Sequence, residues 1–373
     1  MNTELPETPE TIEQLRREVS TVLSIESVTV SRRRPETISF RGQLLVSPSD
    51  AFALLRPRFE TLGFTPTFTR AEGRDVVSAL PGVVWARESN PMINLVLFLL
   101  TVLTTLWTGA INEGYDPLQN PANLLQGVPF SFTLLAILGV HEFGHYFMAR
   151  RYKAPVTLPY FIPLPPGLGL GTMGAVIRLK APFMDRRSLF DVGIAGPLAG
   201  LAVAVPLLFW GLSQSQVGPL QPGGLQEGNS IFYAFAKFVV FGKFLPGGGE
   251  DVFISSTAFA AWLGLFITAL NLLPAGQLDG GHVAYALLGE KSRYLGGIVI
   301  GLLVILGLPL GDLLGIPYPG YAGWFTWVLF IVVFGLAHPT PLNDLTDLGM
   351  PRRLLGAFSW FLFIILFTPL PFS

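Results

Sequence analysis

Cysteine is absent from this chain of 373 residues, and histidine occurs only four times. The lack of cysteine excludes disulfide bonds and thiolate metal ligands. Any metal in this chain must therefore be held by His, Asp or Glu. The four candidate histidines are His141, His145, His282 and His338.

Charge is also scarce. Only 13% of the residues are Asp, Glu, Lys or Arg and 50% are hydrophobic, whereas soluble domains carry about 25% charged residues. The mean hydropathy is +0.53. Because so little charge cannot cover a soluble particle, we expect a lipid bilayer to surround most of the chain. The net charge of −1 argues against a nucleic-acid partner.

Residues 1–86 lack long apolar runs. Their pattern predicts a helix over 11–23, strands in SVTVSRRR and ETISFRGQLL, a helix over 49–62 capped by Ser49, and a hairpin of GFTPTFTR and RDVVSALP. We therefore predict a small soluble α+β domain of unknown role over 1–86, and a membrane domain over 87–373. The acidic start MNTELPETPE has no signal-peptide pattern, so we expect the first domain in the cytosol.

Seven apolar runs in the second domain are long enough to span a bilayer. They cover residues 92–111, 129–150, 188–210, 256–274, 295–311, 322–338 and 354–371. If they alternate in direction, 22 of the 24 Lys and Arg residues fall on the side of the N-terminus, and only Lys237 and Lys243 fall on the other. The positive-inside rule then places the N-terminus in the cytosol and the C-terminus on the opposite side.

Residues 155–183 are apolar but rich in Pro and Gly. Irregular backbone at membrane depth must be surrounded by protein or line a cavity. This segment is therefore predicted to form a re-entrant β-hairpin. The fold class expected from the whole sequence is a polytopic α-helical membrane protein with about seven spans, this hairpin and the small N-terminal α+β domain.

The run HEFGH at residues 141–145 places two histidines four residues apart, on one face of a helix. His141 and His145 can bind one Zn²⁺, with Glu142 beside them as general base. Three ionisable groups inside an apolar span are costly and usually mark function. A third ligand is needed, and Asp279 in the run NLLPAGQLDGGH is preferred over His282, which is expected to support the ligands from outside.

Asn271 opens the same run as a buried amide in an apolar span. It either bonds between helices or holds the substrate backbone or the oxyanion. His338 lies at the end of a span and is expected at the interface. The hairpin edge can accept an unwound substrate strand, and Gly174, Ala175, Val176 and Ile177 are the predicted substrate-binding residues there.

HEFGH followed by NLLPAGQLDGG resembles the site-2 protease family of intramembrane metalloproteases, and GTMGAVIRLKAP and RRSLFDVGIAGPLAGL between them are further matches. The resemblance covers roughly residues 88–373. It implies His141, His145 and Asp279 as ligands of one zinc ion per chain, Glu142 as acid/base, and Asn271 and the Gly174 region near the substrate. GNSIFYAF and the absence of an inserted PDZ-like domain resemble the cyanobacterial and plastid branch.

The predicted function is zinc-dependent hydrolysis of peptide bonds in or near transmembrane segments of single-span or polytopic membrane proteins. The expected location is an inner, plasma or thylakoid-type membrane. Two alternatives remain: a membrane-anchored zincin that cuts soluble or misfolded chains, and a catalytically dead scaffold that keeps zinc.

Overall fold

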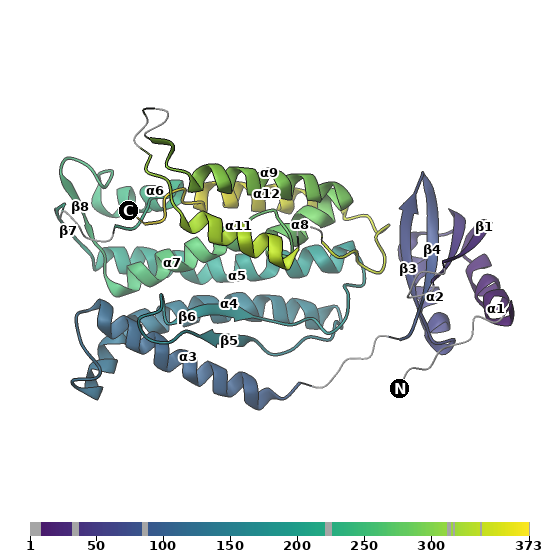
Figure 1. Cartoon of the computed structure of the whole chain (residues 1–373), viewed down its shortest axis with the longest axis horizontal. Coiled ribbons are helices and arrows are strands. Elements are labelled where there is room, and N and C mark those ends of the chain that lie inside the picture. Colours follow the sequence, from purple (N-terminus) through teal and green to yellow (C-terminus); the bar gives the residue numbers. More distant parts are fainter. Residues whose placement is uncertain are drawn as a thin grey trace. The chain divides into compact units, whose positions relative to one another are not determined.

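The computed structural model describes residues 9–31, 37–83, 89–220, 226–311, 315, 318–335 and 338–372. The chain forms two compact units, each with its own interior (Figure 1). The first unit consists of Met1–Glu88, Leu179–Phe190 and Pro339–Met350. The second unit consists of Ser89–Arg178, Asp191–His338 and Pro351–Ser373. The predicted domain of residues 1–86 thus lies in one unit with two segments from later in the chain.

The first unit contains the predicted α+β fold. Its elements are α1 (Pro9–Ser20), β1 (Leu23–Ser31), β2 (Thr37–Leu44), α2 (Pro48–Thr61), β3 (Phe64–Ala71) and β4 (Arg74–Pro81). All pairs are antiparallel, and the strand order is β1-β2-β4-β3. Alternate residues of β2 and β4 are buried, as a sheet with one covered face requires.

Helix α2 begins two residues earlier than expected. The sequence predicts Ser49 as its cap, but Ser47 has this role, because its hydroxyl accepts the Asp50 N–H at 3.2 Å. Pro48 then occupies the first helical position, where a missing N–H costs nothing. The prediction of Ser49 was wrong because both serines fit the composition of a cap, and only the backbone geometry separates them.

Strand β3 is extended at its edge by a segment that follows much later in the chain. The Phe68 N–H donates to Leu342 O at 2.7 Å, and the Asp344 N–H donates to Phe68 O at 2.9 Å. Asn343 forms parallel bridges to Phe68 and to Asp185. Leu342, only 7% exposed, belongs to the apolar cluster of the first unit. This unit therefore folds around residues that the sequence assigns to the membrane domain.

Helices dominate the second unit. In chain order, its elements and those entering it are α3 (Pro91–Asn112), η1 (Pro121–Gly127), α4 (Val128–Arg151), β5 (Tyr160–Pro163), β6 (Thr172–Val176), α5 (Arg186–Ser213), β7 (Gln216–Pro219), α6 (Ile231–Phe241), β8 (Glu250–Phe253), α7 (Ser256–Asn271), α8 (Asp279–Leu288), η2 (Gly289–Lys291), α9 (Ser292–Gly307), α11 (Gly323–Phe334) and α12 (Gly349–Leu366).

Four helices in the described part of the chain are long and apolar enough to cross a membrane: α3, η1 with α4, α5 and α12. Each of the seven predicted runs overlaps one helix, the others being α7, α9 and α11. Those three have 16, 16 and 12 residues. A helix of 16 residues is about 24 Å long, short of a hydrocarbon core of about 30 Å. The number of seven spans therefore stays a prediction.

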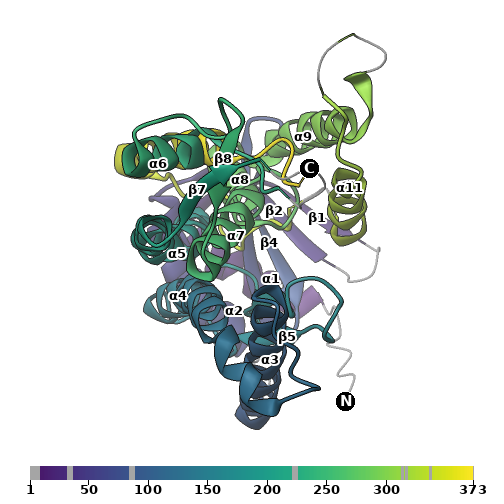
Figure 2. The same cartoon turned by 90° about the vertical axis from the view of Figure 1, so that its left-hand side faces the viewer.

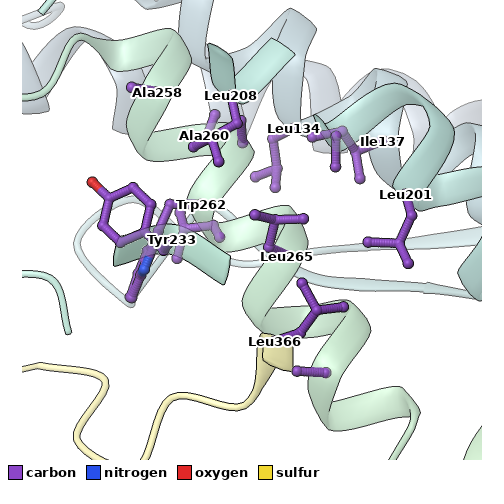
Figure 3. Packing of buried hydrophobic residues seen from close by; sticks show 14 of the residues in the cluster. Leu134, Ile137, Leu201, Leu208, Tyr233, Ala258, Ala260, Trp262, Leu265 and Leu366 are labelled. Atoms are coloured by element: carbon purple, nitrogen blue, oxygen red, sulfur yellow. The ribbon is translucent and has the colours of Figure 1, made fainter. Parts of the chain in front are cut away.

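Helices α4, α5 and α7 pack together around one apolar cluster (Figures 2 and 3). Glycine and alanine allow the close approach. A Cβ on Gly264 of α7 would lie 2.8 Å from Cδ1 of Ile137 on α4, and one on Gly211 of α5 would lie 2.4 Å from the backbone nitrogen of Ala258 on α7. Larger side chains at these two glycines would separate the helices that carry the site.

The predicted hairpin forms, as β5 and β6 pair antiparallel. It lies along α3 (Figure 1). The Asn94 amide donates to the carbonyls of Leu158 and Pro159, both at 2.9 Å, and the Thr104 hydroxyl donates to Gly171 O at 2.6 Å. Polar side chains of α3 thus satisfy backbone carbonyls at the base and near the tip of the hairpin, as non-helical backbone in an apolar setting requires.

Helix α6 follows the third predicted span and is anchored by a buried lysine. Lys237 is fully buried, with Nζ 3.4 Å from Asp251 Oδ1 and 3.6 Å from Glu227 Oε1. The Tyr233 hydroxyl also donates to Glu227 at 2.8 Å. Burial raises the pKa of Glu227, and the charge of Lys237 opposes that shift. Opposite charges offset the cost of burying this ammonium group.

Candidate metal centre

Helix α4 carries the first two candidate ligands. It runs unbroken through HEFGH because its only proline lies in its first turn. His141 and His145, one turn apart, bring their Nε2 atoms to within 3.1 Å of each other. Their exposed fractions are 4% and 5%. As the four-residue spacing predicts, both imidazoles lie on the same face of α4 and their Nε2 atoms approach each other.

Asp279, the first residue of α8, completes the group. Its Oδ2 lies 3.2 Å from Nε2 of His141 and 3.3 Å from Nε2 of His145. The glycines after it permit this position: a Cβ on Gly280 would lie 2.0 Å from Leu272 O. The Asp-Gly-Gly run therefore lets α8 begin directly against the turn that follows α7.

The three donor atoms fit a tetrahedral metal ion. Their separations of 3.1, 3.2 and 3.3 Å form a nearly equilateral triangle. Tetrahedral zinc with bonds of about 2.0–2.1 Å needs ligand atoms roughly 3.3 Å apart. In the described part of the chain, these are the residues grouped closely enough to hold a metal ion. Two imidazoles and one carboxylate leave the fourth position open, as in catalytic zinc sites.

Helix α5 orients His145. Its Nδ1 lies 2.7 Å from the carbonyl oxygen of Val192. Because a carbonyl can only accept, Nδ1 carries the proton and the lone pair of Nε2 faces the other donors. This contact fixes both the tautomer and the ring orientation that metal binding requires. A backbone acceptor cannot be recognised from the sequence.

Three glycines on α5 make room for the histidines. Gly193, Gly196 and Gly200 are spaced by three and four residues, so they lie on one face of the helix. A Cβ on Gly196 would lie 2.1 Å from Nε2 of His145, and one on Gly200 would lie 3.2 Å from Cβ of His141. This role was not predicted from the sequence, although the spacing of the glycines in DVGIAGPLAG was a usable signal.

Glu142 lies beside the donor group. It is 6% exposed, and its Oε1 is 3.9 Å from Nε2 of His141. The backbone N–H of Ile177, just beyond the end of β6, lies close to its carboxylate. The predicted base and the predicted substrate-binding segment therefore meet at one point.

The other predicted substrate-binding residues divide into two groups. Asn271, the last residue of α7, lies beside the candidate metal ligands, and its Nδ2 is 3.4 Å from Nε2 of His141. Gly174, Ala175 and Val176 lie in β6, which packs on α4. Gly174 has a φ of +107°, a conformation that suits glycine.

His282, the rival ligand, has another partner. Its Nδ1 lies 2.5 Å from Nε2 of His338, whose ring stacks on Tyr285. His282 also packs against α5: a Cβ on Gly193 would lie 2.8 Å from the Cβ of His282. His282 is thus placed next to the ligands, and its pairing with His338 was not foreseen in the sequence.

Comparisons with known proteins point to the same class. The model of Peptidase family M50 matches residues 129–306. The chain is similar to the probable zinc metalloprotease EGY1, chloroplastic, of Oryza sativa subsp. japonica, with 29% identity over 324 residues, 80% of this chain and 53% of the relative. It is similar to the probable zinc metalloprotease EGY2, chloroplastic, of Arabidopsis thaliana, with 27% identity over 388 residues, 98% of this chain and 66% of the relative. No solved structure matches.

The fold and the site together define a helical membrane protein with a His-His-Asp metal centre among its helices. The matched region includes both HEFGH and NLLPAGQLDGG. The chain is similar to members of the site-2 protease family, as these motifs predict. It spans about half the length of the first curated relatives that it matches.

Proposed function

We propose that this protein is an intramembrane zinc metalloprotease that hydrolyses peptide bonds in or near transmembrane segments of other membrane proteins. The observation that carries the proposal is the triangle of donor atoms from His141, His145 and Asp279, with the carboxylate of Glu142 beside it. Zinc suits two imidazoles and a carboxylate in this geometry. The relatives whose names include zinc support the choice of metal.

The position of the centre along α4 supports cleavage inside the bilayer. His141 lies ten residues before the end of α4 at Arg151. At 1.5 Å per residue, the centre is about 15 Å from that end, or half of a hydrocarbon core of about 30 Å. The hairpin reaches a similar depth, because its anchors Asn94 and Thr104 on α3 are also ten residues apart.

Glu142 is the proposed general base and acid. When bound, zinc would polarise the scissile carbonyl and lower the pKa of a bound water. Glu142 then takes the proton of the attacking water and delivers it to the leaving amine. The Ile177 N–H, which lies close to this carboxylate, is proposed to orient it. The Asn271 amide, next to His141, can donate a hydrogen bond to the developing oxyanion.

The substrate segment is proposed to bind as a strand along β6. A transmembrane helix hides its carbonyls in internal hydrogen bonds, so it must unwind before hydrolysis. The sheet of β5 and β6 has two strands, so the far edge of β6 has no strand partner in the described part of the chain. Neighbouring residues in a strand direct their N–H groups to opposite edges. Ala175 is therefore proposed to share its edge with Ile177, whose N–H lies close to the Glu142 carboxylate.

We further propose that the protein lies in an inner, plasma or thylakoid-type membrane with its N-terminus on the cytosolic or equivalent side. The distribution of Lys and Arg supports this orientation. The names of the relatives cited above place those proteins in chloroplasts, which is compatible with a thylakoid-type membrane. The side that the C-terminus faces depends on the number of spans.

The test is cleavage of a panel of single-span membrane substrates by purified protein, with Glu142→Gln as the matched control. The variant keeps all three proposed ligands, so zinc should stay bound while cleavage falls by about 10²–10⁴-fold. Equal cleavage by both proteins would exclude the assigned base. Cleavage of soluble chains but no membrane substrate would favour the membrane-anchored zincin, and zinc binding without cleavage of either would favour the inactive scaffold.

A further inference from the structure

A network of three side chains ties together the ends of α4, α5 and α12. Arg352, in the first turn of α12, donates from Nε to Asp191 Oδ1 at 2.8 Å and from a terminal nitrogen to Oδ2 at 2.7 Å. The Tyr152 hydroxyl, at the end of α4, donates to the same carboxylate. Arg352 also donates to that hydroxyl at 3.3 Å. All three side chains belong to the second unit.

The geometry of the network fixes orientation as well as distance. Two parallel hydrogen bonds from one guanidinium to both oxygens of Asp191 define the plane of the carboxylate. A lysine cannot reproduce this fork. Burial, followed by the bond to Asp191, raises the pKa of the Tyr152 phenol, so it stays protonated and able to donate. The carboxylate is thus held from two helices at once.

Asp191 is adjacent to the residue that orients a proposed metal ligand. The next residue, Val192, provides the carbonyl oxygen that accepts the Nδ1 proton of His145 at 2.7 Å. One turn further along α5, Gly196 packs under the same imidazole. Seven residues after His145 along the other helix, Tyr152 joins the network. A small rotation or shift of α5 would therefore move the Val192 carbonyl away from His145.

We propose that Arg352 is a positioning residue for the metal centre, acting through Asp191 and Val192 on the imidazole of His145. Its fork holds α5 in the register that presents the Val192 carbonyl to Nδ1, while Tyr152 holds α4 to the same anchor. The inference rests on the proposed zinc centre, but it concerns metal affinity and geometry rather than cleavage.

The experiment measures zinc affinity of the full-length purified protein by competition with a chromophoric chelator. Loss of a partner outside the ligands typically weakens metal binding by 10- to 100-fold. Arg352→Met should therefore raise the zinc Kd by about tenfold or more, and Arg352→Lys should give a smaller rise. Arg293→Met is the matched control, because Arg293 lies on α9, outside this network, and is exposed. Its Kd should equal that of the wild type.

A second readout separates positioning from simple stabilisation. The visible spectrum of the Co²⁺-substituted protein reports the ligand geometry, and it should change in Arg352→Met but not in Arg293→Met. A folded Arg352→Met variant with lower thermal stability, unchanged zinc Kd and an unchanged cobalt spectrum would overturn the proposal. If that variant does not fold, Tyr152→Phe removes one hydrogen bond from Asp191, and an unchanged Kd there would overturn it equally. A wild-type protein that binds no zinc would instead refute the proposed function.

Discussion

The Cβ position of Gly196 lies 2.1 Å from Nε2 of His145, closer than non-bonded atoms can approach. Nε2 is the atom that lies 3.3 Å from Asp279 and 3.1 Å from Nε2 of His141. A methyl group at residue 196 would therefore occupy the space of a proposed ligand atom. The absence of a side chain on α5 is as necessary to the centre as the imidazole on α4.

Gly196→Ala should abolish or severely weaken zinc binding, by at least the 10- to 100-fold typical of changes just outside a metal centre. The imidazole must move, or α5 must separate from α4. Metal analysis after gel filtration measures the loss. Gly301→Ala on α9 is the control, because nothing lies within 4 Å of the Cβ it would gain. Normal zinc content in Gly196→Ala would show that His145 does not bind metal in this position.

The ligand helix was predictable because its information is local. Four residues separate His141 from His145, and helical periodicity alone places them together. Asp279 is 134 positions after His145 in the chain, so its selection depended on the need for a third ligand and on the family resemblance. The role of the Val192 carbonyl depends on how α5 packs against α4, which no local pattern in the sequence records, whereas the spacing of Gly196 from its neighbouring glycines was a usable signal.

The limits of the fold prediction have a similar cause. Each hydrophobic run overlaps a helix, but α11 ends at Phe334, whereas its run was extended to 338. Composition does not record where a helix breaks. Leu342 was likewise assigned to a loop of the membrane domain, yet it packs in the apolar cluster around Phe68. Contacts between distant segments of the chain decide such cases.

Asp279→Ala should lower zinc retention strongly, whereas His282→Ala should retain most of it. Asp279 contributes an oxygen to the donor triangle, while Nδ1 of His282 pairs with His338. Zinc content of both purified variants, measured after the same exposure to a chelator, checks the expectation. The opposite ranking of the two variants would move the third ligand to His282.

Leu342→Ala should destabilise the first unit by about 2 kcal/mol or more, the usual cost of removing a buried leucine side chain. Leu342 is 7% exposed within that cluster. Amide hydrogen exchange in Phe64–Ala71 (β3) should become faster, because its edge pairs with this segment. Leu54→Ala on α2 is the control, since Leu54 is 45% exposed. Unchanged protection of β3 would mean that the unit does not depend on the later segment.

Proline at two positions of the hairpin should separate substrate binding from catalysis. Proline removes the backbone N–H. Ala175→Pro removes a donor from the proposed substrate edge of β6, so KM should rise while zinc stays bound. Ile177→Pro removes the N–H that lies close to the Glu142 carboxylate, so kcat should fall instead. Initial rates with a single-span substrate over a range of concentrations give both constants. Ala175→Gly keeps the N–H and should leave KM close to that of the wild type. A wild-type KM in Ala175→Pro would show that β6 does not bind the substrate, and Asn271 on α7 would become the next position to test.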